Sequence, residues 1–312
     1  MSKKVLITVA IHEYIQQRFE ALGYSVDNKP EIDRDRLLEI IPDYAVLIIT
    51  TYTQVDKELI DKAANLKIVG RVGSGMENVD TDYCQQKEIA CFSSPEGNAN
   101  AVGEHSLAML LNVLNNINKA NNELKNRIFL REENRGEELD GKTIGIIGYG
   151  HTGQAFAKKL RGFEVDILVY DTYKQAEDSY VKNTSLKEIQ EKCDVISFHV
   201  PYTHETHHYC DNRFIAGCAK APVIINTSRG GIIELVSMIN ALHNKQLRGL
   251  CIDVFEDEPI TREKVHCVLE YDMLFSFPNV VATPHIAGWT VESKYKLAKV
   301  LMDKIEIWLN SQ

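Results

Sequence analysis

Thr143-Ile-Gly-Ile-Ile-Gly148-Tyr-Gly150-His-Thr-Gly153 is the stretch that decides the fold, because an apolar run leads directly into three glycines with the spacing GxGxxG. A helix-like segment follows at 154–160, and a second apolar run at 165–170 ends on Asp171. A strand, a glycine turn, a helix and a second strand that ends on an acidic residue are typical of a dinucleotide-binding βαβ unit.

Each glycine of this motif has a physical reason. Gly148 permits a tight turn, Gly150 lets a phosphate approach the backbone, and Gly153 lets the helix pack closely on the strand. Asp171 lies 18 residues after Gly153, where a carboxylate accepts hydrogen bonds from ribose hydroxyls and repels a 2′-phosphate. The motif therefore predicts NAD rather than NADP as the cofactor. The predicted binding residues in this unit are Gly148, Gly150, His151, Thr152, Gly153 and Asp171.

The composition is that of an ordinary globular protein and argues against several kinds of partner. Of the 312 residues, 44% are hydrophobic and 25% charged, and the formal net charge is −9. Nucleic acids and anionic membranes need a basic surface, so we expect neither as a partner. No apolar run approaches the length of a membrane span. Seven scattered cysteines without a CxxC pair predict reduced thiols and a cytoplasmic location.

Apolar runs alternate with helix-like segments along the chain, which predicts an α/β protein with parallel sheets. The early runs are Val5–Ala10, Ala45–Thr50 and Leu66–Val72. A chain of this length is expected to form two domains. We expect two doubly wound parallel-sheet domains, in which a Rossmann NAD-binding domain at 100–286 is inserted into a flavodoxin-like substrate domain formed by 1–99 and 287–312.

One long helical pattern runs from Asn98 to about Asn126, with Gly103 as its single weak point. Its apolar positions cover a wider face than one packing stripe requires, so we expect both sides to be buried. These positions include Leu107, Leu110, Leu111, Val113, Leu114 and Ile117. We interpret the segment as a connector between the domains that also carries a homodimer interface.

Three ionisable side chains each follow a short apolar run in the second half of the chain. They are Arg229 after Val223–Asn226, Glu258 after Leu250–Val254, and His285 after Val280–Thr283. Ligands of doubly wound sheets lie beyond the carboxyl ends of the strands, so the three are expected to converge on the cofactor. Arginine can bind a carboxylate and polarise a carbonyl, histidine exchanges protons near neutral pH, and a carboxylate orients the imidazole. This trio predicts hydride transfer to and from a 2-hydroxy acid.

These motifs together resemble the D-2-hydroxyacid dehydrogenase family, in the family's order and over nearly the whole chain. The carrying segments are 139–143 with the glycine motif, 226–231, 253–259 and 283–288. The resemblance implies that Arg229, Glu258 and His285 are catalytic and that the chain forms a homodimer through 98–126. It implies that Val72, Gly73, Ser74 and Gly75 bind the substrate carboxylate. It also implies that Val200, Pro201, Thr206, Thr227, Asp253 and Gly288 line the cofactor.

The segments 69–75, 78–80 and 95–98 are similar to those of 3-phosphoglycerate dehydrogenases, which favours 3-phosphoglycerate, a precursor in serine biosynthesis, as substrate. One segment departs from that resemblance. Thr50-Thr51-Tyr52-Thr53 stands where those enzymes carry an arginine for the substrate phosphate, and Arg131 or Arg135 would have to compensate. Hydroxypyruvate, glyoxylate or a D-lactate-type acid is therefore the alternative substrate. Because the chain ends at Gln312, we expect no C-terminal regulatory domain.

Two further interpretations have to be weighed. NAD-sensing transcriptional co-repressors resemble the same fold, so a binding protein without turnover is an alternative of another class. His204-Glu205-Thr206-His207-His208 matches the zinc-protease pattern HExxH. That pattern needs a helix, whereas here it follows a strand and Pro201, so we predict no metal site.

Overall fold

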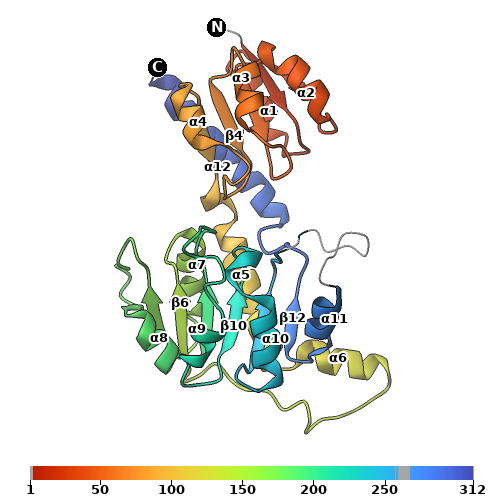
Figure 1. Cartoon of the computed structure of the whole chain (residues 1–312), viewed down its shortest axis with the longest axis vertical. Helices are drawn as coiled ribbons and strands as arrows, with labels where there is room; N and C mark the ends of the chain where they lie inside the picture. Colours follow the sequence, from red (N-terminus) through yellow and green to blue (C-terminus); the bar gives the residue numbers. More distant parts are fainter. Residues whose placement is uncertain (1–2, 257, 259–267, 312) are drawn as a thin grey trace. The chain divides into compact units, whose positions relative to one another are not determined.

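The computed structural model describes residues 3–256, 258 and 268–311. The chain divides into two compact units. Met1–Asn98 and Trp289–Gln312 form the first unit, and Ala99–Gly288 form the second. Each unit is built on its own parallel sheet (Figure 1). The substrate and cofactor roles expected of the two halves remain predictions.

The first unit contains a five-stranded sheet in the order β2-β1-β3-β4-β5. The strands are β1 (Lys4–Ile7), β2 (Ser25–Asn28), β3 (Val46–Ile49), β4 (Ile68–Arg71) and β5 (Ala90–Ser93). The helices are α1 (Tyr14–Ala21), α2 (Arg34–Ile40), the short 3-10 helix η1 (Ile41–Asp43), α3 (Lys57–Lys62), α4 (Thr81–Gln86) and α12 (Val291–Asn310). Alternation along β3 sends Leu47 to one face and Ile48 to the other, so both faces need apolar cover. Helices α2, α3 and α4 cover one face, and α1 and α12 cover the other.

The second unit contains a seven-stranded sheet in the order β12-β11-β10-β9-β6-β7-β8. The strands are β6 (Thr143–Ile147), β7 (Asp166–Tyr170), β8 (Lys182–Asn183), β9 (Val195–Phe198), β10 (Val223–Asn226), β11 (Gly249–Ile252) and β12 (Val280–Ala282). The helices are α5 (Pro95–Leu114), α6 (Ile117–Lys125), α7 (His151–Leu160), α8 (Leu186–Lys192), α9 (Asn212–Ala216), the 3-10 helix η2 (Gly230–Ile232), α10 (Leu235–His243) and α11 (Val268–Ser276). Helices α5 and α7 pack on one face, and α8, α9 and α10 pack on the other.

Both sheets confirm the predicted fold class of two doubly wound parallel-sheet units. In the second sheet, β6 lies between β7 and β9. The chain therefore leaves β6 toward one edge of the sheet and later returns to build the other half. At such a reversal the loops after the two central strands diverge, which is where doubly wound sheets bind their ligands.

The expected single helix from 98 to 126 is wrong in one respect, because the structure divides it into α5 and α6. Asn116 separates the two helices with a φ of 53°, a left-handed conformation that ends an α-helix. Side chains stabilise the break. The Asn112 Oδ1 atom accepts a 2.9 Å bond from the Asn118 amide, and Asn116 Nδ2 donates to the Arg135 carbonyl. Apolar spacing continues through the break, so it did not reveal the turn.

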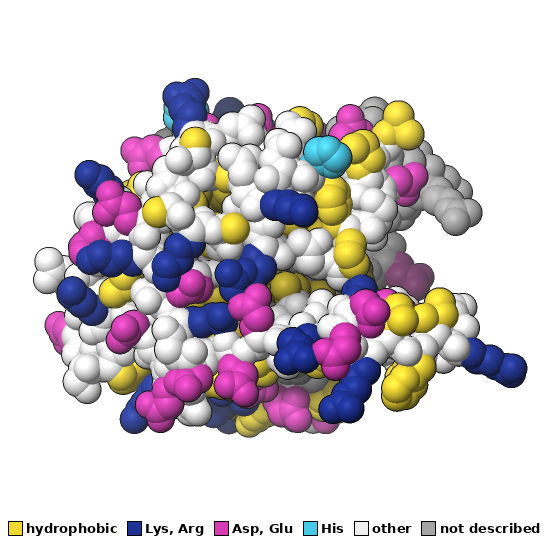
Figure 2. Space-filling model, turned by 90° about the horizontal axis from the view of Figure 1, so that it is seen from below, with side chains coloured by type: hydrophobic (Ala, Val, Ile, Leu, Met, Phe, Trp, Pro, Cys, Tyr) yellow, Lys and Arg dark blue, Asp and Glu magenta, His cyan; other side chains and the backbone are white. Residues whose placement is uncertain are grey.

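The surface mixes charges of both signs. On the face shown in Figure 2, lysine and arginine side chains are interspersed with aspartate and glutamate, as expected of a solvated surface. None of the described helices combines the length and the apolar composition that a membrane crossing requires.

Candidate active site

The glycine motif forms the turn between β6 and α7. Gly148 has a φ of 88°, in the region that favours glycine. A Cβ atom on Gly153 would lie 2.2 Å from the Gly148 carbonyl oxygen, so only glycine lets α7 come this close. A Cβ atom on Gly150 would meet nothing within 4 Å, and no side chain caps α7. The helix thus presents backbone N–H groups beside open space, an arrangement that fits a pyrophosphate.

Asp171 stands at the end of β7, beside this turn. Its carboxylate accepts hydrogen bonds from the backbone amides of Tyr149 (2.7 Å), Tyr173 (2.8 Å) and Lys174 (3.1 Å). Burial alone would raise the pKa of Asp171, but the three amide bonds outweigh it and lower the pKa below its ordinary value. The side chain is therefore a fixed anion near neutral pH.

A buried histidine supports the turn from β9. His199 Nδ1 lies 3.2 Å from Thr152 Oγ1, and its Nε2 lies 2.8 Å from Ser197 Oγ. Its ring packs against Phe156 of α7 with a centroid separation of 5.6 Å. Burial lowers the pKa of His199 to about 3, so the imidazole is neutral and exchanges single hydrogen bonds with both hydroxyls.

The structure brings His285 and Glu258 together. His285 Nδ1 lies 2.6 Å from Glu258 Oε2, although the residues are 27 positions apart. The pKa of His285 is raised mainly by this hydrogen bond. Burial opposes the rise, the charges of Glu258 and Asp253 add to it, and the charge of Arg229 lowers it. The contact with Glu258 thus engages Nδ1 and does not involve Nε2.

Asp253 fixes the backbone that carries this histidine. Its carboxylate is buried and accepts hydrogen bonds from the amides of Ile286 (2.8 Å) and Ala287 (2.7 Å) and from the Thr283 hydroxyl (2.6 Å). His285 itself has a φ of 55°, an uncommon conformation for a residue with a side chain. The carboxylate predicted to line the cofactor is thus already engaged by three donors between 283 and 287, one hydroxyl and two backbone amides.

Arg229 follows β10 in an extended conformation, immediately before η2. Its Nη1 donates a 2.8 Å bond to the Ser228 carbonyl, and Ser228 Oγ donates to the Phe198 carbonyl at the end of β9. A Cβ atom on Gly230 would lie 1.9 Å from the Phe255 carbonyl carbon. The segment after β10 is therefore pressed against the turn that carries Glu258.

Of the other residues predicted to line the cofactor, two groups have defined contacts. Thr206 Oγ1 donates a 2.7 Å bond to the Pro201 carbonyl, which closes the loop after β9, and Val200 is the second residue of that loop. Thr227 Oγ1 lies 3.1 Å from Ser106 Oγ of α5. Gly288 ends the second unit.

In the first unit, the predicted substrate loop Val72–Gly75 follows β4. The Gly73 amide donates a 3.2 Å bond to Ser94 Oγ, and the Gly73 carbonyl accepts a 2.8 Å bond from the Ser94 amide. Ser74 Oγ donates a 3.0 Å bond to Asn98 Oδ1. These bonds tie the loop to the segment after β5, so its shape is set by its own unit.

The segment that lacks the expected arginine lies at the end of β3. Asn78 Nδ2 donates to the carbonyls of Thr50 (2.8 Å) and Thr53 (2.6 Å), which fixes this segment as a turn. Arg71, at the end of β4, is only 6% exposed, and its Nη2 donates a 3.4 Å bond to Thr51 Oγ1. A guanidinium from the neighbouring strand thus reaches the turn. Arg135, considered above as a replacement, instead pairs with Glu132 in its own loop.

The HExxH segment lies in a turn, where its two histidines do not share a helix face. Three potential ligands do lie within 4.8 Å of one another, namely His207, His208 and Glu256. The two imidazole rings are stacked, with centroids 3.9 Å apart and planes inclined by 24°. A bound ion must lie in the plane of each ring that ligates it, so stacked rings do not present a shared position. His208 instead makes a 3.0 Å hydrogen bond with Glu256.

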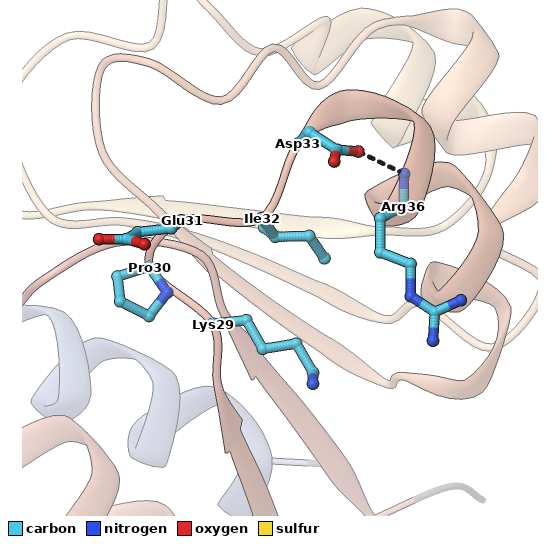
Figure 3. A pocket seen from close by; sticks show the side chains of 6 residues that line it. All are labelled: Lys29, Pro30, Glu31, Ile32, Asp33 and Arg36. Atoms are coloured by element: carbon cyan, nitrogen blue, oxygen red, sulfur yellow. Dashed lines mark hydrogen bonds between the residues drawn. The ribbon is translucent and has the colours of Figure 1, made fainter.

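A surface pocket of about 370 Å³ opens after β2, the edge strand of the first unit (Figure 3). It is lined by Lys29, Pro30, Glu31, Ile32, Asp33 and Arg36. Asp33 is committed to capping α2, because it accepts the Arg36 amide at 2.8 Å. In the sheet, β1 and β3 separate β2 from β4, so the pocket is separate from the predicted substrate loop.

Sequence reasoning did not identify two supporting residues. His105 of α5 contacts Thr283 next to the predicted catalytic histidine, and Ser228 anchors the arginine segment. Both lie in patterns that look like ordinary helix or turn, so no local signal distinguished them.

The chain is similar in sequence to several known proteins. The family model described as "D-isomer specific 2-hydroxyacid dehydrogenase, NAD binding domain" matches residues 107–287, more than half of the chain. The chain is 34% identical over 274 residues to a hydroxypyruvate reductase of Thermotoga maritima, covering 88% of each protein. It is 31% identical to a D-3-phosphoglycerate dehydrogenase of Methanocaldococcus jannaschii, over 97% of this chain. That match covers only 57% of the relative, so this chain spans little more than half of its length.

The fold has close counterparts among solved structures. The crystal structure of a D-lactate dehydrogenase of Aquifex aeolicus, complexed with NAD and lactic acid, matches with a TM-score of 0.85 at 27% identity. The match covers 99% of this chain and 96% of that one. The three relatives act, by their names, on different 2-hydroxy or 2-keto acids.

Proposed function

The chain belongs to the D-isomer specific 2-hydroxyacid dehydrogenase family of NAD-dependent enzymes, and we propose that Arg229, Glu258 and His285 are its catalytic residues. The observation that carries this proposal is the 2.6 Å contact between His285 Nδ1 and Glu258 Oε2. A carboxylate that is hydrogen-bonded to one imidazole nitrogen fixes the tautomer of the ring and makes the other nitrogen more basic. Proton transfer near neutral pH requires both effects.

The reaction follows from the chemistry of these side chains. When bound, NAD would supply the acceptor for the hydride from C2 of the hydroxy acid, and NADH would supply the hydride in the reverse direction. In oxidation, neutral His285 takes the hydroxyl proton on Nε2, and the resulting imidazolium is stabilised by Glu258. In reduction, protonated His285 gives that proton to the forming alkoxide while Arg229 polarises the carbonyl. The backbone of Val72–Gly75 binds the substrate carboxylate in this proposal.

The cofactor is held by residues of the second unit. In this proposal the backbone around Gly148–Gly153 binds the pyrophosphate, and Asp171 binds the adenosine ribose hydroxyls. The open space at Gly150 and the anionic state of Asp171 support these roles. Val200, Pro201, Thr206, Thr227 and Gly288 line the nicotinamide half, and Asp253 shapes it through the backbone that it holds.

The favoured substrate is the pair 3-phosphoglycerate and 3-phosphohydroxypyruvate, which would connect the enzyme to serine biosynthesis. A phosphate needs cationic partners, and Arg71 brings a guanidinium to Thr51 in the segment that lacks its own arginine. The second candidate is hydroxypyruvate or a similar unphosphorylated acid, such as glyoxylate or D-lactate. It is supported by the hydroxyl-rich turn Thr50–Thr53 and by the similarity to a hydroxypyruvate reductase.

Steady-state kinetics with NADH test the proposal. The panel comprises 3-phosphohydroxypyruvate, hydroxypyruvate, glyoxylate and pyruvate, and NADPH serves as a second cofactor. We expect turnover with NADH, with 3-phosphohydroxypyruvate preferred. His285→Ala should lower kcat by about 10²- to 10⁴-fold. A preference for an unphosphorylated acid would replace the favoured substrate. Binding of NADH without turnover of any acid would instead favour the co-repressor-like interpretation.

The proposed assembly is the homodimer through 98–126, to which α6 and the residues directly after it would contribute exposed apolar side chains. No residue of α6 is buried, and large apolar side chains stand exposed there, including Ile117, Leu124, Ile128, Phe129 and Leu130. An exposed apolar surface of this kind is typical of an interface with a second copy. Sedimentation should give a dimer that Leu124→Glu with Phe129→Glu dissociates. Tyr173→Glu, at another exposed aromatic position, should leave the dimer intact.

The proposed location is the cytoplasm. The cysteines in the described part of the chain have free thiols, and burial raises the pKa of Cys193 to about 12, so that this thiol stays protonated and unreactive. Reduced, buried thiols fit a reducing compartment.

A further inference from the structure

Thr283 lies two residues before His285 and links a helix to the buried carboxylate of Asp253. Its Oγ1 atom is 2.6 Å from Asp253 Oδ1 and 2.9 Å from His105 Nε2 of α5. An ionised carboxylate only accepts hydrogen bonds, so the single hydroxyl proton of Thr283 lies on the bond to Asp253. His105 Nε2 must therefore carry a proton and donate it to Thr283. This assigns the tautomer of His105 in its neutral form.

The chain of bonds continues into the backbone of the catalytic turn. Asp253 Oδ1 also accepts the Ile286 amide, Oδ2 accepts the Ala287 amide, and the Asp253 carbonyl accepts the His285 amide at 2.7 Å. His285 has a φ of 55°, which a residue with a side chain holds only when its surroundings enforce it. Four hydrogen bonds to Asp253, from 283 to 287, supply that enforcement.

We propose that His105 is a positioning residue for His285, acting through Thr283 and Asp253. The inference rests on the proton-transfer role proposed for His285. Without the donor at 105, the Thr283 hydroxyl keeps its bond to Asp253 but loses its hydrogen bond to α5, where Met109 Sδ, one turn further along, lies 4.0 Å away. The Asp253 carboxylate keeps its two amide donors but loses its link to α5 through Thr283, so the turn that aims the His285 imidazole is held less firmly.

The charged groups that act on His285 are Glu258, Asp253 and Arg229. His105 is not among these groups. Its hydrogen bond is with Thr283, and its Nε2 atom lies 3.8 Å from Asp253 Oδ1, so any effect on the His285 imidazole passes through these two residues. A loosened Asp253 would move a negative charge away from His285. A loss of His105 should therefore affect both the aim of the imidazole and the pH at which it holds its proton.

His105→Phe keeps a flat aromatic ring at this position and removes the N–H donor to Thr283. We expect kcat for reduction to fall by about 10- to 100-fold, because a catalytic group displaced by an ångström loses that much rate. The KM for NADH should change by less than about twofold, because the contacts proposed for the pyrophosphate and the adenosine ribose, at Gly148–Gly153 and Asp171, are untouched. The alkaline limb of the pH–rate profile should move to lower pH. His105→Gln, which restores an N–H donor, should recover most of the rate. His243→Phe, on an exposed histidine at the end of α10, is the matched control.

Thr283→Val and Thr283→Ser test the same chain independently, should His105→Phe fail to fold. Valine removes the hydroxyl and should reproduce the loss, while serine keeps it and should not. The proposal is overturned if His105→Phe, or Thr283→Val in its place, keeps kcat within about twofold and an unshifted pH profile while His285→Ala is inactive. If His285→Ala itself turns over normally, the proposed catalytic role is the part that fails.

Discussion

In the proposed mechanism, the pair formed by His285 and Glu258 decides which protonation state of the imidazole meets the substrate. The hydrogen bond and the negative charge of Glu258 raise the pKa of His285, against the opposing effects of burial and Arg229. A raised pKa keeps His285 protonated, as reduction requires, up to a higher pH. The neutral form that oxidation requires then becomes abundant only at a higher pH. In that mechanism Glu258 therefore sets the pH window of each direction, besides orienting the ring.

Glu258→Gln should reveal both effects. We expect kcat to fall by about 10- to 100-fold, because the imidazolium loses its carboxylate. The pKa of His285 should fall, so the alkaline limb of reduction and the acid limb of oxidation both move to lower pH. The measurement is kcat/KM against pH in each direction. Glu256→Gln is the matched control, because Glu256 lies in the same turn and bonds to His208 instead. A Glu258→Gln enzyme with unshifted limbs would contradict the assignment.

His199 gives a prediction about stability. Its pKa is about 3 when folded and about 6.5 in a flexible chain, so between these values the unfolded state binds a proton that the folded state does not. Stability should therefore fall as pH decreases from 6.5 toward 3, by up to about 1.4 kcal/mol per pH unit from this group. Urea titrations between pH 7 and pH 5 should show a shallower pH dependence for His199→Gln. His243→Gln, at an exposed position, should retain the dependence of the unmodified protein.

Elements whose boundaries depend on local signals could be predicted from sequence. The β6–α7 turn is one such element, because Gly148 and Gly153 are required by backbone geometry that any GxGxxG turn shares. The division of α5 from α6 could not be predicted. It depends partly on the bond from Asn116 to the distant Arg135 carbonyl, which forms only once the loop 126–142 has returned to the helix, whereas the Asn112–Asn118 bond is local to the break.

Asn116→Ala tests the origin of that break. Alanine in the left-handed region is strained, so we expect the variant to be less stable by about 1 kcal/mol. Asn116→Gly should lose less, because glycine adopts a φ of 53° without strain. Urea denaturation measures both. Asn121→Ala, at an exposed position within α6, should not destabilise the protein. If Asn116→Ala stabilised the chain, the preferred structure would be one continuous helix.

At the scale of the whole molecule, the candidate site is a product of sheet topology. Arg229, Glu258 and His285 come from three different connections, and parallel strands deliver all three to one edge. That convergence could be predicted, because it needs only the order of strands and motifs. The roles of His105 and of the Asp253 carboxylate could not, since they depend on how α5 packs beside β11 and β12.

Because the cofactor site is assigned to the second unit alone, NADH should stabilise the two units unequally. At a concentration about 100 times its Kd, a ligand adds about 2.7 kcal/mol to the free energy of unfolding of the unit that binds it. Hydrogen exchange of the core amides in β6 and β9 should then slow by about 100-fold where exchange requires that unit to unfold. The amides of β3 and β4, in the first unit, should keep their rates when no acid is present. Equal protection of both sheets by NADH would show that the first unit also binds the cofactor. The His105→Phe enzyme should retain the full protection in β6 and β9, because its defect lies in the turn at 283–287 and not in cofactor binding.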